Sequence, residues 1–165
     1  MSRVMLSSWE PIFQAFFFRV QNSPEFFNYY NVDEREAMEL ARIRSKGYLV
    51  EAIARITSQC SPDVDFLDYD EELEEFGFPV TKEEVDLIVS LMFEMFMQKD
   101  IVKLRVHNQL LTSQDLKSAY GVGYMERRTY DEMFEKIVLR NNTLIDSYIS
   151  KDRLTGKRKS IDYGS

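Results

Sequence analysis

Apolar side chains repeat with helical spacing over most of this chain. Between Tyr130 and Ile149 they recur three or four positions apart for about five turns, which places them on one face of a helix. A similar stripe extends from Ala37 to Ile56, and acidic residues precede it, as the positive end of a helix dipole favours. No segment alternates apolar and polar residues over a useful length, so the pattern predicts an all-α fold.

The most apolar segment of the chain, Val85 to Met97, predicts a buried central helix. It is too short to cross a bilayer and contains two acidic residues, so we expect no membrane partner. Thr81 and Glu84 have the spacing of a capping box, in which each side chain bonds the other residue's backbone N–H at a helix start. We expect five or six helices to form a bundle around this central helix.

Shorter segments complete the expected bundle. We predict a first helix near the capping pattern of Ser7 and Glu10, a short aromatic helix in "NSPEFFNYY", one or two surface helices in the acidic segment 63–75, and a short helix in "SQDLKSAY". The glycines of "GVGYM", which begins at Gly121, predict a loop between helices. Gly47 predicts a close helix crossing.

Length and charge divide the chain into one helical domain, residues 1–150, and an extended basic C-terminal arm, residues 151–165. The arm has five basic residues against two acidic ones, a net charge of +3, so the first 150 residues carry −10 of the total of −7. The arm has no apolar stripe to bury, and we expect it to be disordered alone and to order on a partner. Its predicted docking residues are Lys151, Arg153, Lys157, Arg158, Lys159, Ile161 and Tyr163.

The residues needed for common catalytic and metal sites are missing. His107 is the only histidine, so a Ser-His-Asp triad or a His-based metal cluster lacks members. Cys60 is the only cysteine, and we interpret it as a small buried thiol. An EF-hand loop counted from Asp63 would need a glycine where Asp68 stands. We therefore predict a non-enzymatic protein with no catalytic site, no metal and no cofactor.

The acidic segment between the second and the central helix predicts an exposed face. Such a face is either merely solvated or used for docking, and the sequence leaves both open. Its members are Asp63, Asp65, Asp68, Asp70, Glu71, Glu72, Glu74 and Glu75.

Phenylalanines crowd the first helix and the segment that follows it. Successive side chains on a helix point about 100° apart, so three consecutive phenylalanines cannot all face one core. An exposed aromatic patch is typical of protein interfaces. We predict a subunit interface formed by Phe16, Phe17, Phe18, Phe26 and Phe27.

One segment leaves a second function open, that of a helix-turn-helix DNA-binding regulator. In "SQDLKSAYGVGYMERRTYDEMF", Leu116 and Gly121 fall near the inner residue and the turn glycine of that motif, and Arg128 falls on the following helix. However, Lys117 stands where a small residue should pack, and Arg127 where an apolar one should. The acidity of the chain also argues against nucleic-acid binding.

The order of these features resembles the head-to-tail connector (adaptor, or neck) proteins of tailed bacteriophages. The resemblance covers Phe26 to Ile149. It is carried by "FFNYYNVDEREAMELARIRSKGYLVEAIARI", by "CSPDVDFLDYDEELEEFGFPVTKEEVDLIVSLMFEMFM" and by "LLTSQDLKSAYGVGYMERRTYDEMFEKIVLRNNTLIDSYI". In such proteins an acidic stretch leads into a capped apolar helix, a "DLK"-like short helix and a long final helix ending in an aromatic residue.

This resemblance implies a structural virion protein of the neck, assembled in the host cytoplasm. Family members form a ring, usually a dodecamer, beneath the portal and around the DNA exit channel. The implied partners are further copies of the chain, the portal protein, and further neck or tail-completion proteins, with the C-terminal arm docking on the portal. Genomic DNA would pass through the channel without sequence-specific binding, since an acidic wall repels phosphates.

Overall fold

In the computed structural model, four helices and one short hairpin organise the residues that the structure describes, which are 8–21, 27, 31–110 and 121–160. For residues 100–110 and 121–130 the description covers the backbone only. The helices are α1 (Glu10–Val20), α3 (Glu34–Cys60), α4 (Lys82–Leu110) and α6 (Gly121–Ile149), and the hairpin pairs β1 (Tyr69–Asp70) with β2 (Glu75–Phe76). The fold is 67% helix and 6% strand, which agrees with the predicted all-α class, and the predicted bundle of five or six helices is not confirmed.

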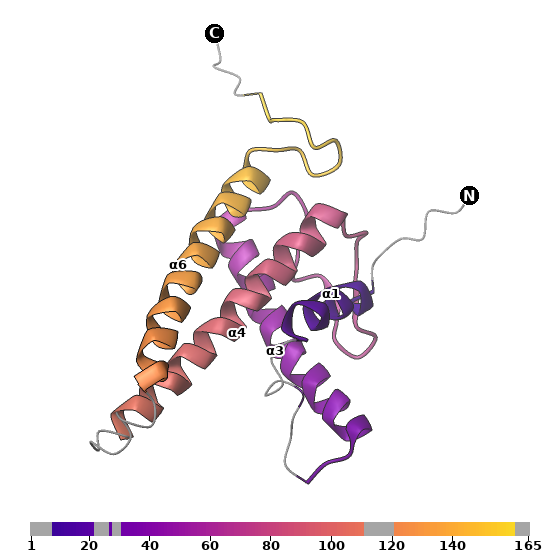
Figure 1. Ribbon diagram of the computed structural model, residues 1–165. Coiled ribbons are helices and arrows are strands. Elements are labelled where there is room, and N and C mark those ends of the chain that lie inside the picture. Colours follow the sequence, from indigo (N-terminus) through magenta and orange to yellow (C-terminus); the bar gives the residue numbers. More distant parts are fainter. Residues whose placement is uncertain (1–7, 22–26, 28–30, 111–120, 161–165) are drawn as a thin grey trace.

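Helix α4 is the central helix, as the apolar segment predicts. It packs against α1, α3 and α6, and it runs antiparallel beside α6 (Figure 1). Neighbours on several sides explain why its apolar residues are not confined to one stripe. The buried apolar residues of α4 are Leu87, Ile88, Val89, Leu91, Met92, Phe96 and Met97.

The starts of α3 and α4 show why these helices begin where they do. Asp33 caps α3 by accepting a hydrogen bond from the Glu36 N–H at 2.8 Å. At α4 the predicted capping box is confirmed: Thr81 Oγ1 accepts from the Glu84 N–H at 3.2 Å, and Glu84 Oε2 accepts from the Thr81 N–H at 2.8 Å.

The hairpin covers the beginning of α1 with aromatic side chains. The Trp9 ring is fully buried and lies 5.5 Å from the Tyr69 ring and 5.9 Å from the Phe76 ring. The backbone N–H of Trp9 also donates to the backbone carbonyl of Glu74 at 2.8 Å. The rings and this backbone bond together tie the hairpin to α1, since both apolar area and a satisfied amide are buried there.

The prediction of one or two surface helices in the acidic segment is wrong, because the backbone forms the β1–β2 hairpin there. Asp70 Oδ1 accepts from the N–H groups of Glu72 and Leu73, both at 2.9 Å, and Glu74 has a positive φ of 54°. Aspartate side chains that bond the backbone in this way compete with a helix and favour turns.

The predicted loop at "GVGYM" is also wrong, since α6 already contains Gly121 and Gly123. Glycine lowers helix propensity by about 1 kcal/mol but does not forbid a helix. The predicted helix in "SQDLKSAY" and nearly all of the one in "NSPEFFNYY" lie outside the described residues. The close crossing predicted at Gly47 is not found within the described part of the chain, because a Cβ placed there would meet nothing within 4 Å.

Candidate interaction surfaces

The C-terminal end of the described chain is anchored on a buried carboxylate. Glu84 is fully buried, and its Oε1 accepts from Arg153 Nε at 2.7 Å and from the Tyr148 hydroxyl at 2.8 Å. Arg153 Nη2 donates to Glu84 Oε2 at 2.9 Å and to the Pro79 carbonyl at 2.7 Å. A carboxylate out of water requires such partners, so Glu84 both caps α4 and anchors the chain after α6.

The electrostatics of the anchor keep its guanidinium charged. The hydrogen bond to Glu84 raises the pKa of Arg153 above its already high value. Burial, together with the same carboxylate, raises the pKa of the Tyr148 hydroxyl, so this group stays protonated and donates.

After the anchor the chain folds back in a basic turn, which we define as residues 151–160. Asp152 Oδ1 accepts from the Thr155 N–H at 2.8 Å, from the Thr155 hydroxyl at 2.8 Å and from the Leu154 N–H at 3.1 Å. These bonds lower the pKa of Asp152. Gly156 has a φ of 65°, a conformation that favours glycine, and the Lys159 N–H closes the turn on the Ser150 carbonyl at 2.9 Å.

The basic turn divides the predicted arm residues into two groups. The Nζ atoms of Lys151 and Lys159 lie 3.4 Å from the carboxylates of Glu83 and Asp63, respectively. Arg153 forms the ion pair with Glu84 described above. Lys157 and Arg158 are exposed, and no ion pair to a described residue is found for either. Ile161 and Tyr163 lie outside the described residues.

Disorder of the arm in the absence of a partner stays a prediction, and over residues 151–160 the structure gives the arm the conformation of this turn. The turn has no apolar stripe to bury, but polar contacts hold Arg153 in place. The guanidinium carbon of Arg153 also lies over the Phe78 ring, 5.5 Å from the ring centroid. Leu154, which the sequence interpretation did not single out, is 75% exposed at the tip of the turn.

The acidic face predicted from the sequence is exposed with one exception, which is Glu74. This carboxylate bonds Arg42 and lies 2.7 Å from Lys46 Nζ, and the bond to Arg42 lowers the pKa of Glu74. The other seven predicted acids are exposed on the hairpin and its flanks, together with Leu67 and Leu73. Among the described residues, no group of three or more potential metal ligands is brought together.

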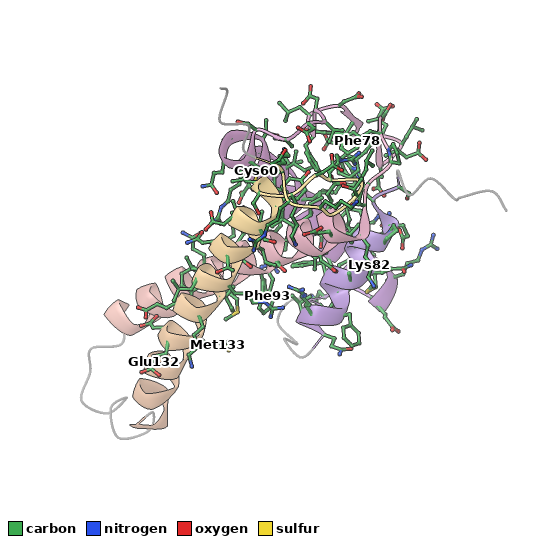
Figure 2. The ribbon with its side chains drawn as sticks, turned by 90° about the horizontal axis from the view of Figure 1, so that it is seen from above. Cys60, Phe78, Lys82, Phe93, Glu132 and Met133 are labelled. Carbon is green, nitrogen blue, oxygen red and sulfur yellow. The ribbon has the colours of Figure 1, made fainter. Side chains whose placement is uncertain are left out.

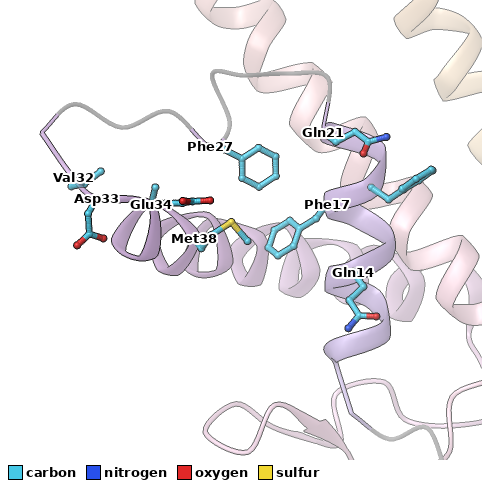
Figure 3. A pocket seen from close by; sticks show the side chains of 10 residues that line it. Gln14, Phe17, Gln21, Phe27, Val32, Asp33, Glu34 and Met38 are labelled. Atoms are coloured by element: carbon cyan, nitrogen blue, oxygen red, sulfur yellow. The ribbon is translucent and has the colours of Figure 1, made fainter.

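The predicted aromatic interface is split by the geometry of α1. Phe16 is fully buried, Phe17 is half-buried, and Phe18 is 72% exposed. Phe17, Phe18 and Phe27 line a hollow of about 820 Å³ between α1 and the start of α3, with Met38 on the α3 side (Figure 3). Phe26 lies outside the described residues.

Of the remaining sequence candidates, only Cys60 has a side chain that the structure describes. Cys60 is buried, and burial raises the pKa of its thiol. Phe78 lies near the basic turn, on the side of the molecule opposite to Glu132 and Met133 (Figure 2). The side chains of His107, Arg127 and Arg128 lie outside what is described.

The backbone is helical from Gly121 onward, so no turn is found at Gly121 itself. Residues 111–120 lie outside the described residues, and the DNA-binding alternative stays a prediction. Within the described part of the chain, no helix is both long and apolar enough to cross a membrane. Comparisons with models of protein families, with curated proteins and with solved structures find no match for this chain.

Proposed function

We propose that this chain is a head-to-tail connector protomer, a structural protein that forms a ring between the portal and the tail of a phage virion. The observation that carries the proposal is the anchored basic turn. Arg153 and Asp152 hold the turn in place, while the side chains of Leu154, Lys157 and Arg158 are exposed. A preorganised loop that keeps an apolar residue and two cations exposed is suited to docking, because little conformational entropy is lost on binding.

On this proposal the basic turn docks on the portal protein. The chemistry of Leu154, Lys157 and Arg158 selects an acidic surface with a small apolar socket. Three of the docking residues predicted from the sequence have a different role on this proposal. They orient the turn through their ion pairs with acidic residues elsewhere in the fold, and they are Lys151, Arg153 and Lys159. The exposed acids of the hairpin remain available to other neck or tail-completion proteins.

The hollow beside α1 supports the ring part of the proposal. Phe18 and Met38 are large apolar side chains left exposed at its edge. A neighbouring copy that covers them would gain about 25 cal/mol for each Å² of apolar surface removed from water. The first 150 residues carry a net charge of −10, which suits a channel wall that DNA passes without sticking.

Electron microscopy of the purified chain, alone and mixed with the portal protein of the same phage, tests the proposal. We expect rings or caps on the portal for the natural chain, and their loss when Lys157 and Arg158 are both replaced by Glu. A matched control replaces Lys82, exposed at the start of α4, by Glu and should still bind. Isolated monomers in both samples would refute the connector, and tight, sequence-selective DNA binding at physiological salt would favour the regulator instead.

A further inference from the structure

Helix α3 has a second apolar stripe on the side that faces away from the core. The helix buries Ala41, Tyr48, Ala52 and Ile56 against its neighbours. Each residue turns a helix by about 100°, so the stripe opposite these positions consists of Leu40, Ile43, Gly47, Val50 and Ala54.

This outer stripe is open to solvent. Ile43 is 64% and Leu40 38% exposed, Gly47 and Ala54 are exposed, and Val50 is only partly covered. A Cβ added at Gly47 would meet nothing within 4 Å. A helix that is apolar on two opposite faces is normally buried on both, and residues alternately three and four positions apart form the seam of a helix pair.

We propose that a second copy of this chain covers the outer stripe with its own α3, in antiparallel orientation about a two-fold axis. The pairing is isologous, so one stripe meets the same stripe on its partner. The proposal goes beyond the connector function and does not rest on it, because ring contacts join two different surfaces.

The sizes of the side chains favour the antiparallel orientation. When Gly47 faces the partner's Val50, Ala54 faces the partner's Ile43, and each layer then combines a small residue with a larger one. In a parallel pair, Gly47 would face the partner's Gly47 and leave a void, while the two bulky Ile43 side chains would meet. Voids and overpacking both weaken a helix interface.

The charges beside the stripe select one antiparallel alignment. In the alignment above, Arg44 lies beside the partner's Glu51, and the two-fold axis repeats this pair. A shift of the partner by one heptad in either direction brings Arg44 to the partner's Arg44, or Glu51 to the partner's Glu51. Like charges disfavour both shifts. Among the described residues, Glu51 contacts Lys99 at 3.4 Å, and both side chains of this pair are exposed.

Cysteine cross-linking tests the orientation. In chains whose Cys60 is replaced by Ala, Ile43→Cys protein is mixed with Ala54→Cys protein and then oxidised. We expect a disulfide-linked dimer in the mixture and little in either protein alone. Cross-linking of Ile43→Cys protein by itself would show a parallel pair and overturn the proposal, as would the absence of any cross-link.

Sedimentation equilibrium tests the pairing without cysteines. We expect the natural chain to dimerise and Ile43→Lys to weaken the dimer at least tenfold, because two lysines would be placed in the apolar seam. Leu139→Lys is the matched control, since Leu139 is similarly exposed but lies on α6, and it should dimerise normally. The proposal fails if the natural chain is monomeric, if Ile43→Lys has no effect, or if only Phe18→Ser at the aromatic hollow disrupts the dimer.

Discussion

The guanidinium of Arg153 lies on the fully buried carboxylate of Glu84, with Nε 2.7 Å from Oε1. The two residues are far apart in the sequence, and their bond joins the turn after α6 to the first turn of α4. Because Glu84 also accepts from Tyr148, the ends of two helices and the C-terminal turn depend on one carboxylate.

We expect Arg153→Ala to lower the free energy of unfolding by about 3–5 kcal/mol, because it leaves a buried charge without its ionic partner. Urea denaturation measures the loss. The exposed Arg158→Ala is the control and should change little. The double variant Arg153→Met with Glu84→Gln should recover part of the loss, because no unpaired charge is then buried while glutamine still completes a capping box. Equal stability of Arg153→Ala and the natural chain would contradict the anchor.

Removal of residues 151–165 should lower the thermal midpoint clearly, whereas removal of residues 161–165 should not. The longer deletion takes away Arg153 and the turn held by Asp152, and the shorter one leaves both in place. Calorimetry of the two shortened chains gives the comparison. If the longer deletion left the midpoint unchanged, the turn would contribute nothing to the fold.

Two glycine-to-alanine changes should have opposite signs. Gly156→Ala should destabilise by about 1 kcal/mol, because alanine is strained at a φ of 65°. Gly47→Ala should stabilise by about 0.5–1 kcal/mol, since the site is helical and open. Denaturation at low protein concentration keeps self-association out of the measurement. The same sign for both changes would be inconsistent with the two backbone conformations.

Asn141→Ala should cost about 1–3 kcal/mol in the free energy of unfolding. Asn141 is buried, and its Nδ2 donates to Glu94 Oε2 at 2.7 Å and to the Ser90 carbonyl at 3.0 Å. Loss of these bonds leaves two buried acceptors short of a donor. The neighbouring Asn142→Ala serves as the control because Asn142 is exposed, and its effect should be small.

Acid should weaken the link between the hairpin and α3. Arg42 lowers the pKa of Glu74 below its ordinary value of 4.5. A carboxylate whose folded-state pKa is depressed contributes stability above its unfolded pKa and loses that contribution as the pH falls through the folded value. The stability difference between the natural chain and Glu74→Gln should therefore be constant above about pH 5.5 and shrink below pH 4.5. A difference that grows on acidification would have the wrong sign.

Local pattern was sufficient for the main helices and for one of their caps. The stripes from Ala37 to Ile56 and from Tyr130 to Ile149 lie within α3 and α6. The capping box at Thr81 forms as its spacing predicts, because both of its hydrogen bonds lie within one helical turn. The apolar run of α4 also predicts its central position, since only a helix covered on several sides buries so many apolar residues.

Part of the aromatic pattern could likewise be interpreted without coordinates. Helical geometry alone requires that the three consecutive phenylalanines diverge, and Phe16 is buried while Phe18 is exposed. Which one turns inward depends on where α4 crosses α1, and that crossing is a tertiary contact. The role of these residues as a subunit interface stays a prediction.

The conformation of the acidic segment could not be predicted from local sequence alone. Its apolar residues fit a helix as well as a hairpin, and the choice was made by contacts distant in sequence. Phe76 packs on Trp9, and the Glu74 carbonyl accepts from the Trp9 N–H. Propensity carries no information about such partners.

By itself, then, the sequence determined the helical class, the central helix and the division between an acidic body and a basic arm, because periodicity and charge are local properties. Only the tertiary structure decided that Arg153 belongs to the body and that Leu154 and Lys157 are left outside. A buried ion pair selects its members by distance and desolvation, and neither can be known until α4 and α6 have been placed side by side.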